Sequence, residues 1–134
     1  MGPLIIILVL GALILAFGLY VLLYRKQRLS QKDKQKIQLL WQEILSLEHS
    51  HPEQAILKAD KLLDFALQKA GYTGTLGEKL KAARAVFRDN DAVWSAHQLR
   101  NQIAHDIDAK LPSGRSGFAL KAFKAAFYDL GIKL

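Results

Sequence analysis

The sequence contains no cysteine, which excludes disulfide bonds and suits a reducing compartment. From about residue 30 onward it also lacks sustained alternation of apolar and polar residues and clusters of β-branched residues, so we expect no β-sheet there. The segment His49-Ser50-His51 is not accompanied by the acidic or cysteine pattern of a metal site, and we expect no metal and no cofactor. Apolar residues instead recur with a period near 3.6, which predicts an all-α fold.

Charged residues are absent from the first 24 positions, where residues 3–24 form an apolar run of 22. As a helix this run is about 33 Å long, enough to cross the roughly 30 Å hydrocarbon core of a bilayer. The alternative is a cleaved signal peptide, but such peptides carry basic residues before a shorter apolar stretch, and none precedes this run. We therefore expect residues 1–24 to be an uncleaved transmembrane anchor that contacts the lipid bilayer through residues 3–24.

Basic residues follow the anchor directly. Residues 25–36 contain six Lys or Arg and one acid, whereas the other flank of the run is uncharged. The positive-inside rule then predicts a single-pass protein of the cell membrane, with its N-terminus outside and its C-terminal domain in the cytoplasm. Residues 37–134 hold 13 basic and 11 acidic residues, so this juxtamembrane segment explains most of the net charge of +7. We expect anionic lipid headgroups to contact three of its side chains: Arg25, Lys26 and Arg28.

The cytoplasmic part, residues 37–134, is long enough for one modest core. Its apolar periodicity predicts a small antiparallel bundle of four or five helices, covering about residues 31–48, 52–70, 76–87, 91–108 and 116–130. Ser50-x-x-Glu53 and Thr75-x-x-Glu78 match capping boxes at the start of the second and third helices. Gly71 and Gly131 are expected to end the second and fifth.

The segment 97–106, "HQLRNQIAHD", concentrates polar side chains in the fourth expected helix. At 100° per residue Arg100 falls inside the apolar arc of this helix, and Asp60 falls at the edge of the apolar arc of the second. A buried arginine is costly unless its charge is paired. One interpretation is therefore a structural pair of Asp60 and Arg100 that ties two helices together. Breaking a buried pair from one side costs roughly 3–5 kcal/mol.

A second face of the fourth helix carries four residues at spacings of four, three and four: Trp94, Gln98, Asn101 and His105. This heptad-like line is more polar than a core and contains an aromatic residue. It predicts the interface of a homodimer, or a cleft between two copies. The alternative is a solvent-exposed face.

Arg100-Asn101-x-x-x-His105 resembles the R-x(4–6)-H signature of the HEPN superfamily, including the Asn that follows the Arg in many members. The late position of the motif in a helical domain, with one helix after it, is also similar, and the resemblance covers roughly residues 31–134. Catalytic HEPN domains are dimeric, metal-independent endoribonucleases. The resemblance implies that His105 transfers a proton around attack by the 2′-hydroxyl, that Arg100 neutralises the phosphate, and that Asn101 orients it.

Two classes of function therefore stay open. The first is a membrane-anchored RNA-binding module or metal-independent endoribonuclease that uses Arg100, Asn101 and His105. The second is a non-catalytic, membrane-tethered adaptor or dimerisation domain, because many HEPN-like domains are inactive and a fold alone does not decide function. We favour the first slightly, since it alone explains why these three groups lie so close together in the sequence.

Overall fold

The computed structural model describes residues 2–23, 29–112 and 114–134, and within these ranges it is entirely helical. Six helices follow one another along the chain: α1 (Gly2–Leu23), α2 (Gln31–Leu47), α3 (Pro52–Lys69), α4 (Leu76–Ala82), α5 (Asn90–His105) and α6 (Arg115–Asp129). The predicted all-α class is confirmed. The contacts expected of Arg25, Lys26 and Arg28 with lipid headgroups lie outside the described residues.

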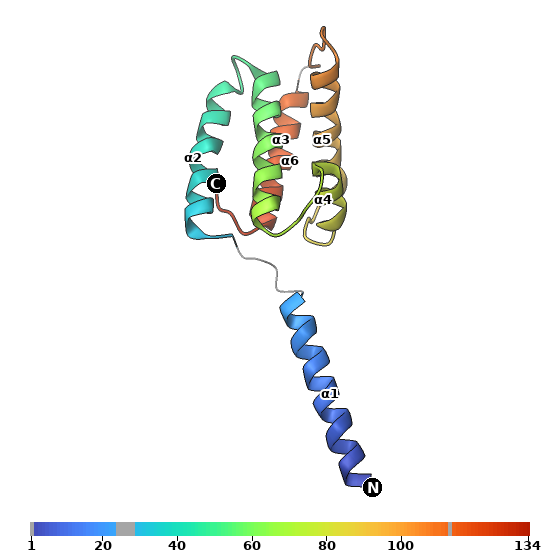
Figure 1. Cartoon of the computed structure of the whole chain (residues 1–134). Coiled ribbons are helices and arrows are strands. Elements are labelled where there is room, and N and C mark those ends of the chain that lie inside the picture. The colour runs from blue at the N-terminus through green and yellow to red at the C-terminus, as the bar shows by residue number, and fades with distance from the viewer. Residues whose placement is uncertain (1, 24–28, 113) are drawn as a thin grey trace.

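Helix α1 stands apart from the other helices (Figure 1). Its segment Gly2–Val21 is long and apolar enough to cross a membrane, and no part of it is buried by the rest of the chain. Exposed apolar side chains such as Leu8 and Leu15 surround this helix on all sides. This pattern is expected of a helix that is surrounded by lipid. A signal sequence near the N-terminus can have the same length and composition.

Helix α3 occupies the centre of the bundle and contacts α2, α4, α5 and α6 (Figure 1). It runs antiparallel to α2 on one side and to α5 on the other, while α6 packs against both α3 and α5. Eight of its residues are buried, and they cover more than one face of the helix. A helix with this pattern is stable only where other helices cover it on several sides. One of the buried residues is charged: Asp60, which is 3% exposed.

The hydrophobic core is formed where α2, α3 and α6 meet. The rings of Trp41 and Phe127 meet edge to face there, with their centroids 5.6 Å apart. The C-terminal tail closes this core, since Ile132 is fully buried and Gln38 Nε2 donates to the Lys133 carbonyl oxygen at 2.6 Å. Every buried hydrophobic residue in the described chain lies at or after Leu29. Residues 29–134 therefore contain a complete core of their own.

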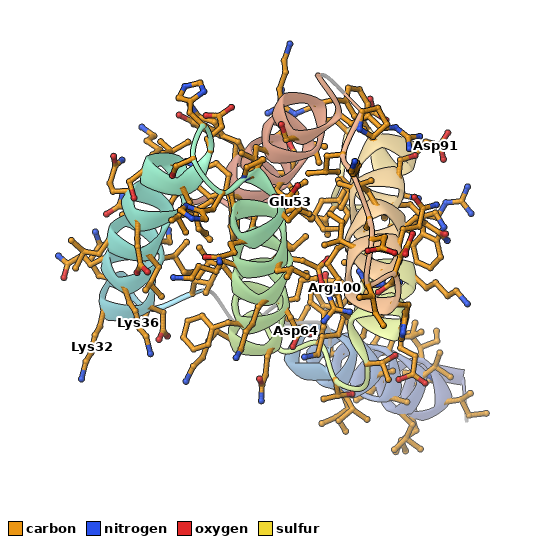
Figure 2. All side chains as sticks on the ribbon, turned by 90° about the horizontal axis from the view of Figure 1, so that it is seen from above. Lys32, Lys36, Glu53, Asp64, Asp91 and Arg100 are labelled. Atoms are coloured by element: carbon orange, nitrogen blue, oxygen red, sulfur yellow. The ribbon has the colours of Figure 1, made fainter. Side chains whose placement is uncertain are left out.

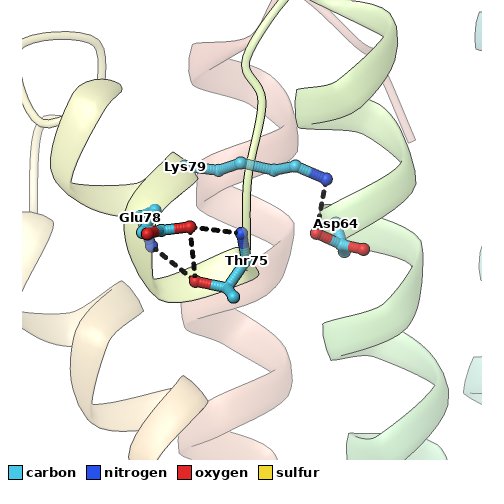
Figure 3. Close-up of polar contacts among 4 residues, drawn as sticks. All are labelled: Asp64, Thr75, Glu78 and Lys79. Atoms are coloured by element: carbon cyan, nitrogen blue, oxygen red, sulfur yellow. Dashed lines mark hydrogen bonds and ion pairs between the residues drawn. The ribbon is translucent and has the colours of Figure 1, made fainter.

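The start of α4 carries the predicted capping box (Figure 3). Thr75 Oγ1 accepts from the Glu78 backbone N–H at 3.3 Å, and Glu78 Oε2 accepts from the Thr75 backbone N–H at 2.7 Å. Glu78 Oε2 also accepts from Thr75 Oγ1 at 3.1 Å, and the backbone and side-chain bonds that Thr75 donates to this carboxylate lower the pKa of Glu78 below its ordinary value. The glycines expected to end α3 and α6 are confirmed as well: Gly71 has φ +95° and Gly131 has φ +80°, conformations that favour glycine.

One expected capping box and two expected helix ends are wrong. The capping box at Ser50 does not form, because His51 is the N-cap residue of α3 and makes no side-chain capping bond. Pro52 explains this: it disfavours helical conformation at the residue before it, so α3 begins one residue later than the box requires. The third helix ends at Ala82 instead of residue 87 and is followed by turns. The fourth ends at His105 instead of residue 108, because Asp106 is extended.

Candidate functional site: a polar groove between α3 and α5

The carboxylate of Asp60 joins α3 to α5 through both of its oxygens. Oδ1 lies 2.8 Å from His97 Nδ1, and Oδ2 lies 3.2 Å from Arg100 Nε. The side chain of Asp60 is 4% exposed, so these two neighbours take the place of water around it. A carboxylate oxygen accepts, which places a proton on Nδ1 of the imidazole. Asp60 and Arg100, the two residues of the expected structural pair, thus lie side by side.

Asn101 completes the cluster from the next position on α5. Its Oδ1 accepts from Arg100 Nη1 at 3.0 Å, and its Nδ2 lies 3.4 Å from His97 Nε2. With the proton on Nδ1, Nε2 is free to accept from the amide of Asn101. The polar cluster therefore consists of four residues, and each contacts at least one other: Asp60, His97, Arg100 and Asn101.

Arg100 is less buried than its place in the apolar arc suggests. Its side chain is 36% exposed, compared with 12% for His97. Its Nε atom is buried and makes no hydrogen bond, although it lies within ion-pair distance of Asp60. The guanidinium therefore reaches out of the core, with Nη1 on Asn101. Figure 2 shows Arg100 extending from α5 in the space beside α3.

The polar cluster opens on a groove of about 750 Å³ between α3, the start of α4 and α5. The groove is lined by polar residues of all three segments: Asp60, Lys61, Asp64, Thr75, His97, Arg100 and Asn101, with Leu57, Leu76 and Gly77. Its two basic side chains, Lys61 and Arg100, are balanced by Asp60 and Asp64. A further lysine, the buried Lys79, places Nζ 2.9 Å from Asp64 Oδ1 and fixes that carboxylate (Figure 3).

His105 does not join the polar cluster. It is the last residue of α5, its side chain is exposed, and it forms no hydrogen bond or ion pair with the described part of the chain. The cause is helix geometry: five residues turn a helix by about 140° beyond a full turn and advance it by about 7.5 Å. Arg100 and His105 therefore point in different directions within one chain.

His97 is a further functional candidate, and the structure adds it to the residues expected from the sequence. It lies three residues before Arg100 and four before Asn101, so all three share one side of α5. That spacing is visible in the sequence. What the sequence does not reveal is that this side faces Asp60, because the pairing of α3 with α5 is a tertiary contact.

The four residues expected at a dimer interface have different surroundings. Trp94 is half-buried within the chain: its ring lies 5.8 Å from the His97 ring, and a Cβ atom at Gly77 would lie 3.8 Å from its Cη2. Gln98 and His105 are exposed, and Asn101 belongs to the polar cluster. An interface between two copies on this face stays a prediction.

Across residues 2–23, 29–112 and 114–134 no group of three or more His, Asp or Glu side chains is placed to hold a metal ion. Comparison of the chain with protein-family models, with curated proteins and with solved structures finds no match. The resemblance to HEPN domains therefore rests on the motif around Arg100 and its helical context.

Proposed function

We propose that this chain is a membrane-anchored, HEPN-like domain that binds RNA at the groove between α3 and α5 and, as a homodimer, cleaves it without a metal ion. The observation that carries this proposal is the position of the Arg100 guanidinium. It is held by Asp60 and Asn101, yet it is 36% exposed on an open groove. A guanidinium held in this way is suited to bind a phosphate oxygen with its remaining N–H groups.

The proposed anchor is α1, with the N-terminus outside and the bundle in the cytoplasm. Its support is the uncharged apolar surface of α1 and the six basic residues of segment 25–36. A domain tethered in this way meets RNA on the cytoplasmic face of the membrane.

The proposed reaction is an internal transfer at phosphorus. A histidine takes the proton of the 2′-hydroxyl, the 2′-oxygen forms a bond to phosphorus, and the 5′-oxygen leaves and takes up a proton. Charge that develops on the non-bridging oxygens is offset by Arg100. Because Arg100 and His105 of one chain point apart, His105 must act on a phosphate bound by the Arg100 of a second copy. The homodimer is therefore part of the proposal.

The test is cleavage of a labelled single-stranded RNA by the full chain in phospholipid nanodiscs. We expect His105→Ala to reduce the rate at least about 100-fold, the lower range for loss of a general acid or base, without lowering the melting temperature. EDTA should leave the rate unchanged. His49→Ala removes an exposed histidine outside the groove and is the matched control. Absence of cleavage by the parent protein, or full activity of His105→Ala, refutes the catalytic proposal.

A non-catalytic adaptor is the second candidate, and one observation favours it. Asp60 neutralises Arg100, and the acidic and basic residues that line the groove balance each other, whereas RNA binders neutralise several phosphates with an excess of basic groups. For an adaptor, the polar cluster only fixes α5 on α3. This candidate predicts no RNA binding by the parent protein, a lower melting temperature in Asp60→Ala, and loss of the dimer in His105→Ala.

A further inference from the structure

Phe65, one turn before the end of α3, lies between two lysines from different helices. Lys36 Nζ of α2 lies 4.8 Å from the centroid of its ring, and Lys69 Nζ of α3 lies 5.6 Å from it. The ring is half-buried, while both lysines are exposed. Phenylalanine beside lysines is typical of basic amphipathic surfaces that lie in the interface of a membrane.

A groove of about 340 Å³ runs from this ring along the contact between α2 and α3. Its floor is apolar and consists of Leu40, Ile44, Leu62 and Phe65; its rim carries Lys36, Lys58, Lys61 and Glu43. Glu43 is occupied by an ion pair with Lys58. Lys36 and Lys61 therefore remain without a carboxylate partner among the described residues, and the groove is apolar below and cationic above. Figure 2 shows Lys36 extending from α2 away from the bundle axis.

The chain itself places this surface close to the proposed anchor. Helix α2 begins at Gln31, eight residues after α1 ends at Leu23, and eight residues span at most about 28 Å. Helix α3 runs antiparallel to α2, so its last turn, with Phe65 and Lys69, lies at the end of the bundle where α2 begins (Figure 1). When α1 spans a bilayer, this end is held within reach of the headgroups at a high effective concentration.

We infer that the α2–α3 surface, defined by Lys36, Lys61, Phe65 and Lys69, binds anionic phospholipid headgroups and docks the bundle on the membrane that holds α1. The ammonium groups bind the headgroup phosphates and carboxylates, and Phe65 contacts the glycerol and upper acyl region. This inference rests on the anchor proposed above. Lys61 lies at the border of the two grooves, whereas Lys36, Phe65 and Lys69 do not line the groove that contains Arg100.

Because the chain contains no cysteine, a single introduced cysteine can report on this docking in the full chain. Gln68→Cys places an environment-sensitive fluorophore in the last turn of α3, and Gln54→Cys places it in the first turn. Both residues are exposed, and 14 residues apart they lie within about 40° of each other on the helix. They are therefore a matched pair that differs mainly in distance from the lipid.

We expect the label at Gln68→Cys to shift its emission to the blue, and to lose access to an aqueous quencher, in nanodiscs of phosphatidylcholine mixed with phosphatidylserine. Neither change should occur in phosphatidylcholine alone or at Gln54→Cys. The double substitution Lys36→Gln/Lys69→Gln should abolish the response. Lys121→Gln/Lys124→Gln removes the same charge from exposed positions of α6 and should not affect it.

Equal emission in the two lipids, or a response that survives Lys36→Gln/Lys69→Gln, overturns the inference. A third outcome also overturns the inference. If the label in phosphatidylcholine nanodiscs responds when an acidic amphipathic peptide is added, the partner of this surface is a protein. Incorporation of the chain into nanodiscs is measured separately by carbonate extraction. Failure to incorporate refutes both the anchor and the docking, whereas incorporation with an unchanged label refutes the docking alone.

Discussion

Replacing Asp60 with alanine removes the contact that joins α5 to α3 through two side chains at once. His97 is 12% exposed, and a hydrogen bond from such a group to a charged acceptor contributes about 1.5–3 kcal/mol. Arg100 is 36% exposed and can turn towards water, so its ion pair contributes about 0–1 kcal/mol, as at a surface. We therefore expect Asp60→Ala to lower the free energy of unfolding by about 1.5–4 kcal/mol.

The same geometry predicts an order among variants. Arg100→Ala should cost about 1 kcal/mol, because Asp60 keeps His97. In double-mutant cycles the coupling of Asp60 with His97 should reach about 1.5–3 kcal/mol, and that of Asp60 with Arg100 should stay below about 1 kcal/mol. Urea denaturation of residues 29–134, followed by circular dichroism, measures each value. A cost of Asp60→Ala below about 1 kcal/mol, or equal costs for Asp60→Ala and Arg100→Ala, would show that the contact of Asp60 with His97 does not stabilise the bundle.

Three further predictions concern the bundle and are checked by the same denaturation measurement. Thr75→Ala should destabilise it by about 1 kcal/mol through loss of the cap of α4, whereas Thr73→Ala, outside the box, should not. The pKa of Glu78 is lowered on folding, so its contribution is present above its ordinary value of 4.5 and is lost as the pH falls through the folded value. The stability difference between the parent and Glu78→Gln should accordingly disappear in acid; a constant difference contradicts this. Phe123→Ala, at a fully buried position, should cost about 3–5 kcal/mol, and a cost below about 2 kcal/mol contradicts the described core.

Some features of the bundle are determined by residues that are close together in the sequence, and these features can be predicted from the sequence. The helical class, the capping box at Thr75 and the ends of α3 and α6 at glycine are of this kind, because each is decided within one turn of helix. The start of α3 shows how two such rules can conflict. The spacing of Ser50 and Glu53 matches a capping box, but the steric effect of Pro52 on His51 is larger and moves the start of the helix.

The residues that form the polar cluster come together through tertiary contacts between α3 and α5. For this reason the sequence predicts the cluster less completely than it predicts the helices. A helical wheel places Arg100 in an apolar arc, yet the long side chain reaches the edge of the bundle and is a third exposed. His97 acquires its role from a carboxylate 37 residues earlier, and no local pattern indicates which helix faces it. The divergence of Arg100 and His105, in contrast, follows from helix geometry alone.

RNA binding at the groove is tested most directly by an NMR titration of ¹⁵N-labelled residues 29–134 with a short single-stranded RNA. We expect the shift changes to concentrate on the groove between α3 and α5, at Thr75, Gly77, His97, Arg100 and Asn101, and we expect Arg100→Ala to abolish them. Unchanged spectra at saturating RNA, or changes confined to α2 and the outer face of α6, would contradict an RNA-binding groove and leave a tethered scaffold.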